Sequence, residues 1–185
     1  MRDRDTDSGF AIVPADPHDP AIHALLRKSE HYAHSLYPAE SVHMLPQDEL
    51  WAPHVHFMAA RDTDTGEVLG CCALVLHAGD GGELKRMYVE APADMRSALR
   101  SDRERLARRR GVGAALMARM EQIARKHGVT VLRFETGPSQ PHAVALGQRF
   151  GYALCGPFGD YAEDPNSVFM EKQLLHRENE HAAPA

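Results

Sequence analysis

A glycine-rich helix start is the sequence feature that most constrains the fold of this chain. Residues 108–116 read Arg-Arg-Arg-Gly-Val-Gly-Ala-Ala-Leu, and they open an amphipathic pattern that continues to about His127. The first N–H groups of a helix have no partner within it and lie at the positive end of its dipole. Gly111 and Gly113 allow a ligand to approach the backbone closely, and three arginines precede them. This segment therefore predicts a site for a phosphate or pyrophosphate group.

Common nucleotide-binding motifs fit this segment poorly. A dinucleotide fingerprint requires Gly-x-Gly-x-x-Gly/Ala directly after a buried strand, whereas Leu116 occupies the third position here and residues 93–110 are polar. No Walker A sequence occurs in the chain. An ordinary helix start with a solvated basic face remains the alternative interpretation.

Hydrophobic patterning around this helix predicts a mixed α/β domain. Turn-forming residues 62–66 separate two apolar runs and suggest a hairpin. Asp19 and Pro20 have the form of a helix N-cap followed by the first helical residue. Strands are expected at Phe10–Val13, Val55–Arg61, Val68–His77, Gly82–Val89, Thr130–Thr136 and Ser167–Leu174, and helices at 19–34, 111–127 and 141–150. We expect a mostly antiparallel, twisted sheet with about four main helices.

Length and composition indicate one domain. The 185 residues, 43% of them hydrophobic, can bury a single core. We place the domain at 9–175, between two tails, 1–8 and 176–185, that are polar, lack periodicity and are expected to be disordered. The net charge of −5 and the absence of a long apolar run argue against nucleic-acid and membrane partners. Three cysteines, two of them adjacent, favour a reducing cytoplasm over a disulfide framework.

Twelve histidines raise the question of a metal site. His31 and His34 could share a helix face, and His54 and His56 could share a strand face, at spacings that zinc tolerates. No further ligands occur at a convincing spacing, so we expect no metal.

An ordered set of motifs resembles a known family. The sequence Arg-x-x-Gly-x-Gly at 108–113 is followed by a strand, a short helix and Gly151-Tyr152. From Phe10 to Leu174 the chain is similar to the GNAT N-acetyltransferases, which transfer acetyl groups from acetyl-CoA. A narrower likeness to small bacterial members rests on Glu40–His43, Gly82–Lys85, Glu135–Gly137, Gly156–Tyr161 and Asp164–Met170.

The resemblance implies acetyl-CoA as cosubstrate and an amine of a small molecule or peptide as acceptor. It places the pyrophosphate among Arg108, Arg109, Arg110, Gly111, Val112, Gly113 and Ala114. It also implies that two central strands separate and that pantetheine lies between them, against the backbone of Met87, Tyr88 and Val89. A backbone N–H near Tyr88 would then meet the thioester oxygen. Members of the family often dimerise, which makes a homodimer possible. An insert of about 93–107, expected to be helical, departs from the family pattern.

Glu83 is the candidate general base, because it matches the strand carboxylate that serves as base in histone-acetylating members. Strand alternation would put Glu83, Lys85 and Met87 on one face, and Leu84, Arg86 and Tyr88 on the other. The alternative is that Glu83 forms an ion pair or binds a cationic substrate.

The general acid is the point at which the resemblance weakens. Many members carry a tyrosine where this chain has Gly147. Water could deliver the proton to the leaving thiolate, or Tyr161 or Tyr88 could do so. The third possibility is a regulatory protein that binds acyl-CoA without catalysis.

Three further residues are candidates for binding the acceptor. Glu40 or Glu135 could hold an ammonium group, and His43 could act as a second base near neutral pH. The alternative for residues 40–42 is a helix or turn cap. Tyr161 lies on a late loop that would face the same pocket.

Overall fold

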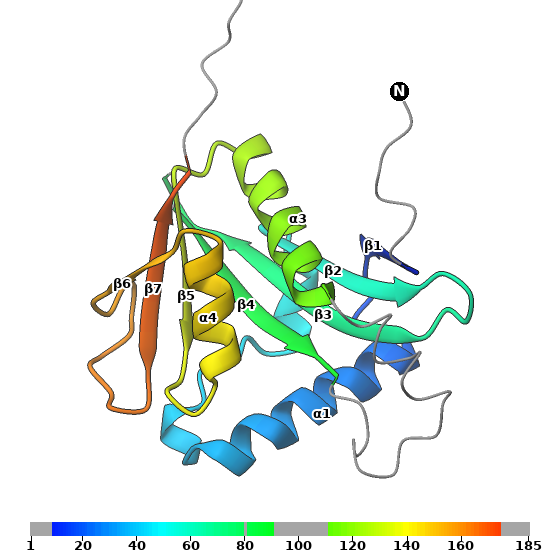
Figure 1. The fold of residues 1–185 in the computed structure, drawn as a ribbon, viewed down its shortest axis with the longest axis horizontal. Helices are drawn as coiled ribbons and strands as arrows, with labels where there is room; N and C mark the ends of the chain where they lie inside the picture. The colour runs from blue at the N-terminus through cyan, green and yellow to red at the C-terminus, as the bar shows by residue number, and fades with distance from the viewer. Residues whose placement is uncertain (1–8, 80, 91–110, 175–185) are drawn as a thin grey trace, which may run out of the picture.

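Seven strands form one sheet in the order β1-β2-β3-β4-β5-β7-β6 (Figure 1). A computed structural model of the chain describes residues 9–79, 81–90 and 111–174. Neighbouring strands are antiparallel except β4 and β5, which run parallel. The strands are β1 (Phe10–Pro14), β2 (Val55–Asp62), β3 (Val68–Leu76), β4 (Gly81–Val89), β5 (Val131–Thr136), β6 (Ala153–Cys155) and β7 (Val168–Gln173).

The described residues contain three α-helices and two short 3₁₀ helices. These are α1 (Pro20–Leu36), α3 (Val112–Lys126), α4 (Pro141–Arg149), η1 (Ala39–Ser41) and η2 (Asp48–Trp51). The mixed, mostly antiparallel fold is confirmed, but the described helices number three rather than about four. The expected helical insert at 93–107 and the expected disordered tails lie outside the described residues. The short strand β6 was not predicted.

The sheet separates two hydrophobic cores. Helices α3 and α4 cover one face, where Leu74, Leu116 and Leu132 are buried together. Helix α1 covers the other face, and there Leu26 and Phe57 are buried. The middle strands β2 and β3 are covered on both faces, and this explains why the sequence of β3 is apolar almost throughout.

Helices α1 and α3 begin in different ways. The carboxylate of Asp19 accepts a hydrogen bond from the N–H of Ala21 at 2.8 Å, as the N-cap prediction requires. Helix α3 begins after Gly111, which has a φ of 90° and gives no side-chain cap. A side chain at that φ would be strained, so glycine suits the turn. The start of α3 therefore keeps backbone N–H groups that no described side chain caps.

Strands β4 and β5 pair over only part of their lengths. The ladder joins Gly81–Leu84 to Val131–Phe134 and stops there. Directly beyond, the β3–β4 register shifts between Cys71 and Ala73, and Arg86 adopts a φ of 54°. These features are those of a β-bulge, which bends a strand and interrupts its pairing. The expected separation of the two central strands is thus present after Leu84.

The bulge also corrects the predicted alternation along β4. Met87 packs against the α3-side core together with Leu84, and Tyr88 packs against the α1-side core. The prediction that Met87 shares a face with Glu83 and Lys85 was therefore wrong. Strict period-two alternation holds only where the strand has no extra residue.

Candidate active site

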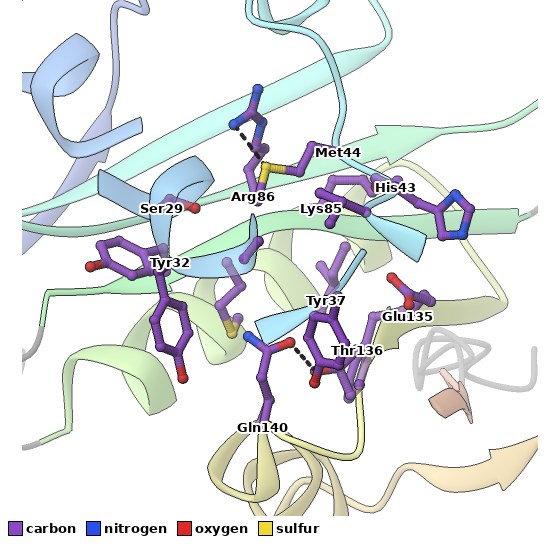
Figure 2. A pocket seen from close by; sticks show the side chains of 18 of the residues that line it. Ser29, Tyr32, Tyr37, His43, Met44, Lys85, Arg86, Glu135, Thr136 and Gln140 are labelled. Atoms are coloured by element: carbon purple, nitrogen blue, oxygen red, sulfur yellow. Dashed lines mark hydrogen bonds between the residues drawn. The ribbon is translucent and has the colours of Figure 1, made fainter. Parts of the chain in front are cut away.

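A cavity of about 140 Å³ occupies the place where β4 and β5 separate (Figure 2). Strand β4 contributes Leu84–Tyr88, and the end of β5 contributes Phe134–Thr136. Met117 of α3 and Ala143 of α4 line it from one face of the sheet, while α1 and the segment after it line it from the other face. The cavity therefore reaches both sides of the sheet through the gap between the two strands.

The start of α3 lies beside the open end of β4. A Cβ built on Gly113 would be 3.7 Å from Val89 and 3.4 Å from Leu146, which are ordinary van der Waals distances. Packing inside the protein therefore does not require glycine here, whereas close approach of a ligand to the backbone would. Of the predicted pyrophosphate residues, Gly111 to Ala114 form this helix start, and Arg108, Arg109 and Arg110 lie outside the described residues. Of the three residues predicted to contact pantetheine, Met87 and Tyr88 line the cavity, and Val89 is not among its lining residues.

Glu83 lies on the paired half of β4, and the structure brings it together with Tyr161. Glu83 is 6% exposed. Its Oε1 accepts a hydrogen bond from the Tyr161 hydroxyl at 2.7 Å and forms an ion pair with Lys85 Nζ at 3.1 Å. Its Oε2 lies 3.4 Å from His77 Nε2. The ion pair that was the alternative for Glu83 is therefore present. Glu83 lines a second, more open cavity that shares His43 and Lys85 with the first.

Tyr161 is a poor proton donor in this arrangement. Burial and the hydrogen bond to Glu83 raise the pKa of its phenol well above the usual value. Lys85 Nζ donates to the same hydroxyl and also to the backbone oxygen of His43, at 3.0 Å in the second case. The hydroxyl of Tyr161 is thus held between an ammonium group and a carboxylate. Such a network favours keeping the phenol protonated.

Glu135 faces the first cavity at the end of β5. Burial raises the pKa of this carboxyl to about 7, although the Ser167 hydroxyl donates to Oε1 at 2.8 Å and lowers it in part. A carboxyl group with a pKa near neutrality can take up a proton and release it again at working pH. The sequence placed Glu135 at the acceptor side, but nothing in the sequence signalled this change in its acidity.

The other two acceptor-side candidates lie in different surroundings. His43 lines both cavities, and its ring meets the ring of Tyr161 edge-on with centroids 5.2 Å apart. Glu40 is exposed in η1 and is not among the residues lining either cavity, whereas its neighbour Ser41 is buried and lines the first. The amide of Asn166 donates to the Ser41 hydroxyl at 3.2 Å, which joins the segment after α1 to the one before β7.

Sequence reasoning missed Tyr37, which follows α1 and lines the first cavity. The backbone N–H of Ser139 donates to its hydroxyl oxygen at 2.9 Å, and the residue is 9% exposed. A Cβ built on Gly137 would overlap this hydroxyl. The signal available in the sequence was Gly137 itself, in the Glu-Thr-Gly motif, because a required glycine often marks a close approach.

Position 147 has no room for the tyrosine that the family often carries there. A Cβ built on Gly147 would lie 2.6 Å from Cζ of Phe134 and 3.0 Å from Sδ of Met170. The ring of Phe134 therefore fills the space beside this glycine.

The described part of the chain contains no group of three or more His, Cys, Asp or Glu residues arranged to hold a metal ion. Within the same residues, every helix is too short or too polar to cross a membrane.

Comparisons with known proteins identify the family. Residues 20–152 match the model of the acetyltransferase (GNAT) family. An IAA acetyltransferase of Azospirillum brasilense is 37% identical over 164 residues, covering 88% of this chain and 97% of the relative. YsnE of Bacillus subtilis, described as an uncharacterized N-acetyltransferase, is 35% identical over 82% of this chain and 91% of its own length.

Solved structures of acetyltransferases are also similar to this chain. A protein of Klebsiella pneumoniae described as an acyl-CoA N-acyltransferase is 32% identical, with a TM-score of 0.67, and covers 91% of this chain and all of its own. An aminoglycoside 6′-acetyltransferase of type Ii shares the fold at 20% identity, with a TM-score of 0.61 over 91% of this chain and 99% of its own. The chain therefore belongs to the acetyltransferase (GNAT) family and is an N-acetyltransferase.

Proposed function

We propose that this enzyme transfers the acetyl group of acetyl-CoA directly to an amine of a small molecule or peptide, with both substrates bound at once. The observation that carries the proposal is the gap between β4 and β5, whose cavity extends to Met117 of α3, the helix whose start no described side chain caps. The open edge of β4 offers main-chain groups to pantetheine, and the helix start offers N–H groups to the pyrophosphate. A structure of the PaiA N-acetyltransferase of Thermoplasma acidophilum, similar in fold, was solved in complex with coenzyme A.

The reaction needs a bond between the acceptor nitrogen and the acetyl carbon, and loss of the bond between that carbon and sulfur. Holding the amine and the thioester in one cavity removes much of the entropic barrier. A backbone N–H of the Met87–Val89 segment would stabilise the negative charge that develops on the thioester oxygen. The acceptor nitrogen must also lose a proton, so a base must face the cavity.

Two carboxylates can serve as the base, and the geometry favours Glu135. It lines the cavity in the gap, and burial raises its pKa to about 7. Glu83, the carboxylate that the sequence suggested, is held by Lys85 and Tyr161 and faces the second cavity. We propose that Glu135 takes the proton and that Glu83 fixes Lys85 and Tyr161 at the acceptor side, with His43 between the two cavities.

The fold alone does not determine which amine the enzyme acetylates. Neighbours with the same fold include an aminoglycoside 6′-acetyltransferase and a ribosomal-protein-S18-alanine N-acetyltransferase. Their named acceptors are unrelated compounds. The buried, unpaired thiols of Cys71 and Cys72 support a reducing compartment such as the cytoplasm. A homodimer is part of the proposal, and sedimentation analysis would test it.

Calorimetric titration with acetyl-CoA in the absence of acceptor tests the first half of this proposal. We expect micromolar binding, followed by release of free CoA when the complex meets a panel of amines, amino acids, polyamines, aminoglycosides and peptide N-termini. If acetyl-CoA binds but no amine in the panel causes release of free CoA, the result would favour the alternative, a regulatory protein that senses acyl-CoA. Absence of binding would contradict both.

A further inference from the structure

The leaving thiolate of coenzyme A needs a proton, and position 147 cannot supply it. The space beside Gly147 is filled by the ring of Phe134, with Met170 next to it. No side chain can extend from residue 147 in this direction without moving both neighbours. The proton donor must come from another element, or from water.

The two tyrosines suggested by the sequence are poorly suited to the task. Tyr161 already donates its proton to Glu83, and Lys85 donates to its oxygen. Tyr88 packs toward α1, with its ring 6.2 Å from that of Tyr32. All three of Tyr32, Tyr37 and Glu135 line the cavity, and in the view of Figure 2 Tyr37 lies between the other two.

Tyr37 has the surroundings that a proton donor requires. Its oxygen accepts the N–H of Ser139 at 2.9 Å, so this bond leaves the hydroxyl proton unused. A hydrogen bond donated to the oxygen stabilises the phenolate that remains after proton transfer. In contrast, the network around Tyr161 contains a carboxylate that holds the proton in place.

Contacts with the segment that follows β5 determine where the side chain of Tyr37 lies. Its phenol lies against Gly137, at a distance that excludes any larger residue there. Glu135 and Thr136, which precede this glycine, line the same cavity. The Glu-Thr-Gly motif thus contains, within three consecutive residues, a carboxylate that lines the cavity and the glycine against which the phenol of Tyr37 packs.

We propose that the Tyr37 hydroxyl protonates the sulfur of coenzyme A as the acetyl group leaves. The inference rests on the proposed function. As the acceptor nitrogen bonds to the acetyl carbon, the carbon–sulfur bond breaks and its electron pair stays on sulfur, which takes the proton of Tyr37. The proton of the amine goes to Glu135. Solvent then removes a proton from Glu135 and returns one to the Tyr37 phenolate, which restores both groups.

The test compares Tyr37→Phe with Tyr161→Phe in the full-length enzyme. Each change removes one hydroxyl oxygen and keeps the ring. For both variants and the wild type, acetyl-CoA affinity is measured by calorimetry, and kcat is measured from pH 6 to 10 with one amine that the wild type accepts. We expect Tyr37→Phe to bind acetyl-CoA normally, to lose about 100-fold in kcat, and to lose the fall in kcat at high pH that ionisation of the acid causes. Tyr161→Phe should keep that high-pH fall.

The pH profile separates catalysis from a structural role, because loosening the Ser139 contact would lower kcat without erasing the high-pH fall. The inference is overturned if Tyr37→Phe keeps the wild-type kcat, or if its kcat drops while the high-pH fall persists. Either result leaves the proposed function intact, since the wild type still transfers acetyl groups. A wild type that binds acetyl-CoA and acetylates no amine overturns the proposed function and this inference together.

Discussion

The two halves of β4 differ in what they do. From Gly81 to Leu84 the strand pairs with β5, and Leu84 joins the α3-side core. From Lys85 onward it remains paired with β3 but leaves β5, and residues 85–88 line the cavity instead. The bulge at Arg86 separates the two halves. The first half joins β4 to β5, and the second has no pairing with β5, which leaves it available for the cosubstrate in the proposed function.

Contacts around the bulge stabilise the half of β4 that does not pair with β5. Arg86, at the bulge, has a buried side chain that forms an ion pair with Glu30 of α1 at 2.8 Å and donates to the backbone oxygen of Leu45 at 2.7 Å. A non-glycine residue at positive φ is tolerated when surrounding contacts hold it. The bulge is therefore fixed by contacts from α1 and from the segment after it, the same segments that line the cavity.

The largest effect should come from Gly113→Glu at the start of α3. A carboxylate there would put bulk and negative charge against the phosphates, so acetyl-CoA affinity should fall at least about 1,000-fold, or about 4 kcal/mol. Calorimetry measures the affinity, and thermal melting checks that the variant folds. Gly113→Ala is the matched control for folding, because its Cβ meets only ordinary contacts within the protein. A folded Gly113→Glu protein with wild-type affinity would remove the pyrophosphate assignment.

In the paired half, Leu132→Ala should lower stability and leave the site unaffected. Leu132 is fully buried and lies opposite Gly82 in the ladder. Its truncation should lower the free energy of unfolding by about 3 kcal/mol. Urea unfolding measures this loss, and acetyl-CoA affinity measured well below the melting temperature should stay at the wild-type value. A large loss of affinity would show that the two halves of β4 are not separable.

Replacing each of the two carboxylates by glutamine shows which of them acts as the base. Glu135→Gln should lower kcat/KM about 100-fold, or about 2.7 kcal/mol, because it removes the carboxylate that we propose as the base. The wild-type rate should rise with pH through about 7, as the Glu135 carboxyl ionises, and the variant should lose this dependence. Glu83→Gln should retain it. The opposite result, with the dependence lost in Glu83→Gln alone, would return the base to Glu83.

Much of the fold could be predicted because local patterns determine it. The N-cap at Asp19, the hairpin turn at 62–66 and the helix after Gly111 depend on residues close together in the chain. Strand β6 escaped prediction because it has only three residues, and Leu154 in its middle is 66% exposed. Such a strand has no buried face to give a periodic signal.

The site was less predictable because it depends on contacts between distant segments. The sequence singled out Glu83, Tyr161 and Glu135, and the structure brings the first two into hydrogen-bond contact. The bulge at Arg86 is held by contacts with Leu45 and Glu30, which lie 41 and 56 positions away in the sequence. Tyr37 meets Ser139 across 102 positions. Period-two alternation in β4 could not show the bulge, which explains why Met87 was assigned to the wrong face.

Hydrogen exchange of β4, with and without acetyl-CoA, tests the central claim most directly. If the ligand lies along the open half of the strand, amides of residues 85–89 and of 112–114 at the start of α3 should become protected when acetyl-CoA binds, because the amide of Ala115 already donates to Gly111. Amides of 81–84 and 131–134, already paired with each other, should change little. Binding that protects neither 85–89 nor 112–114 would contradict the account, because the cosubstrate would then lie elsewhere on the protein.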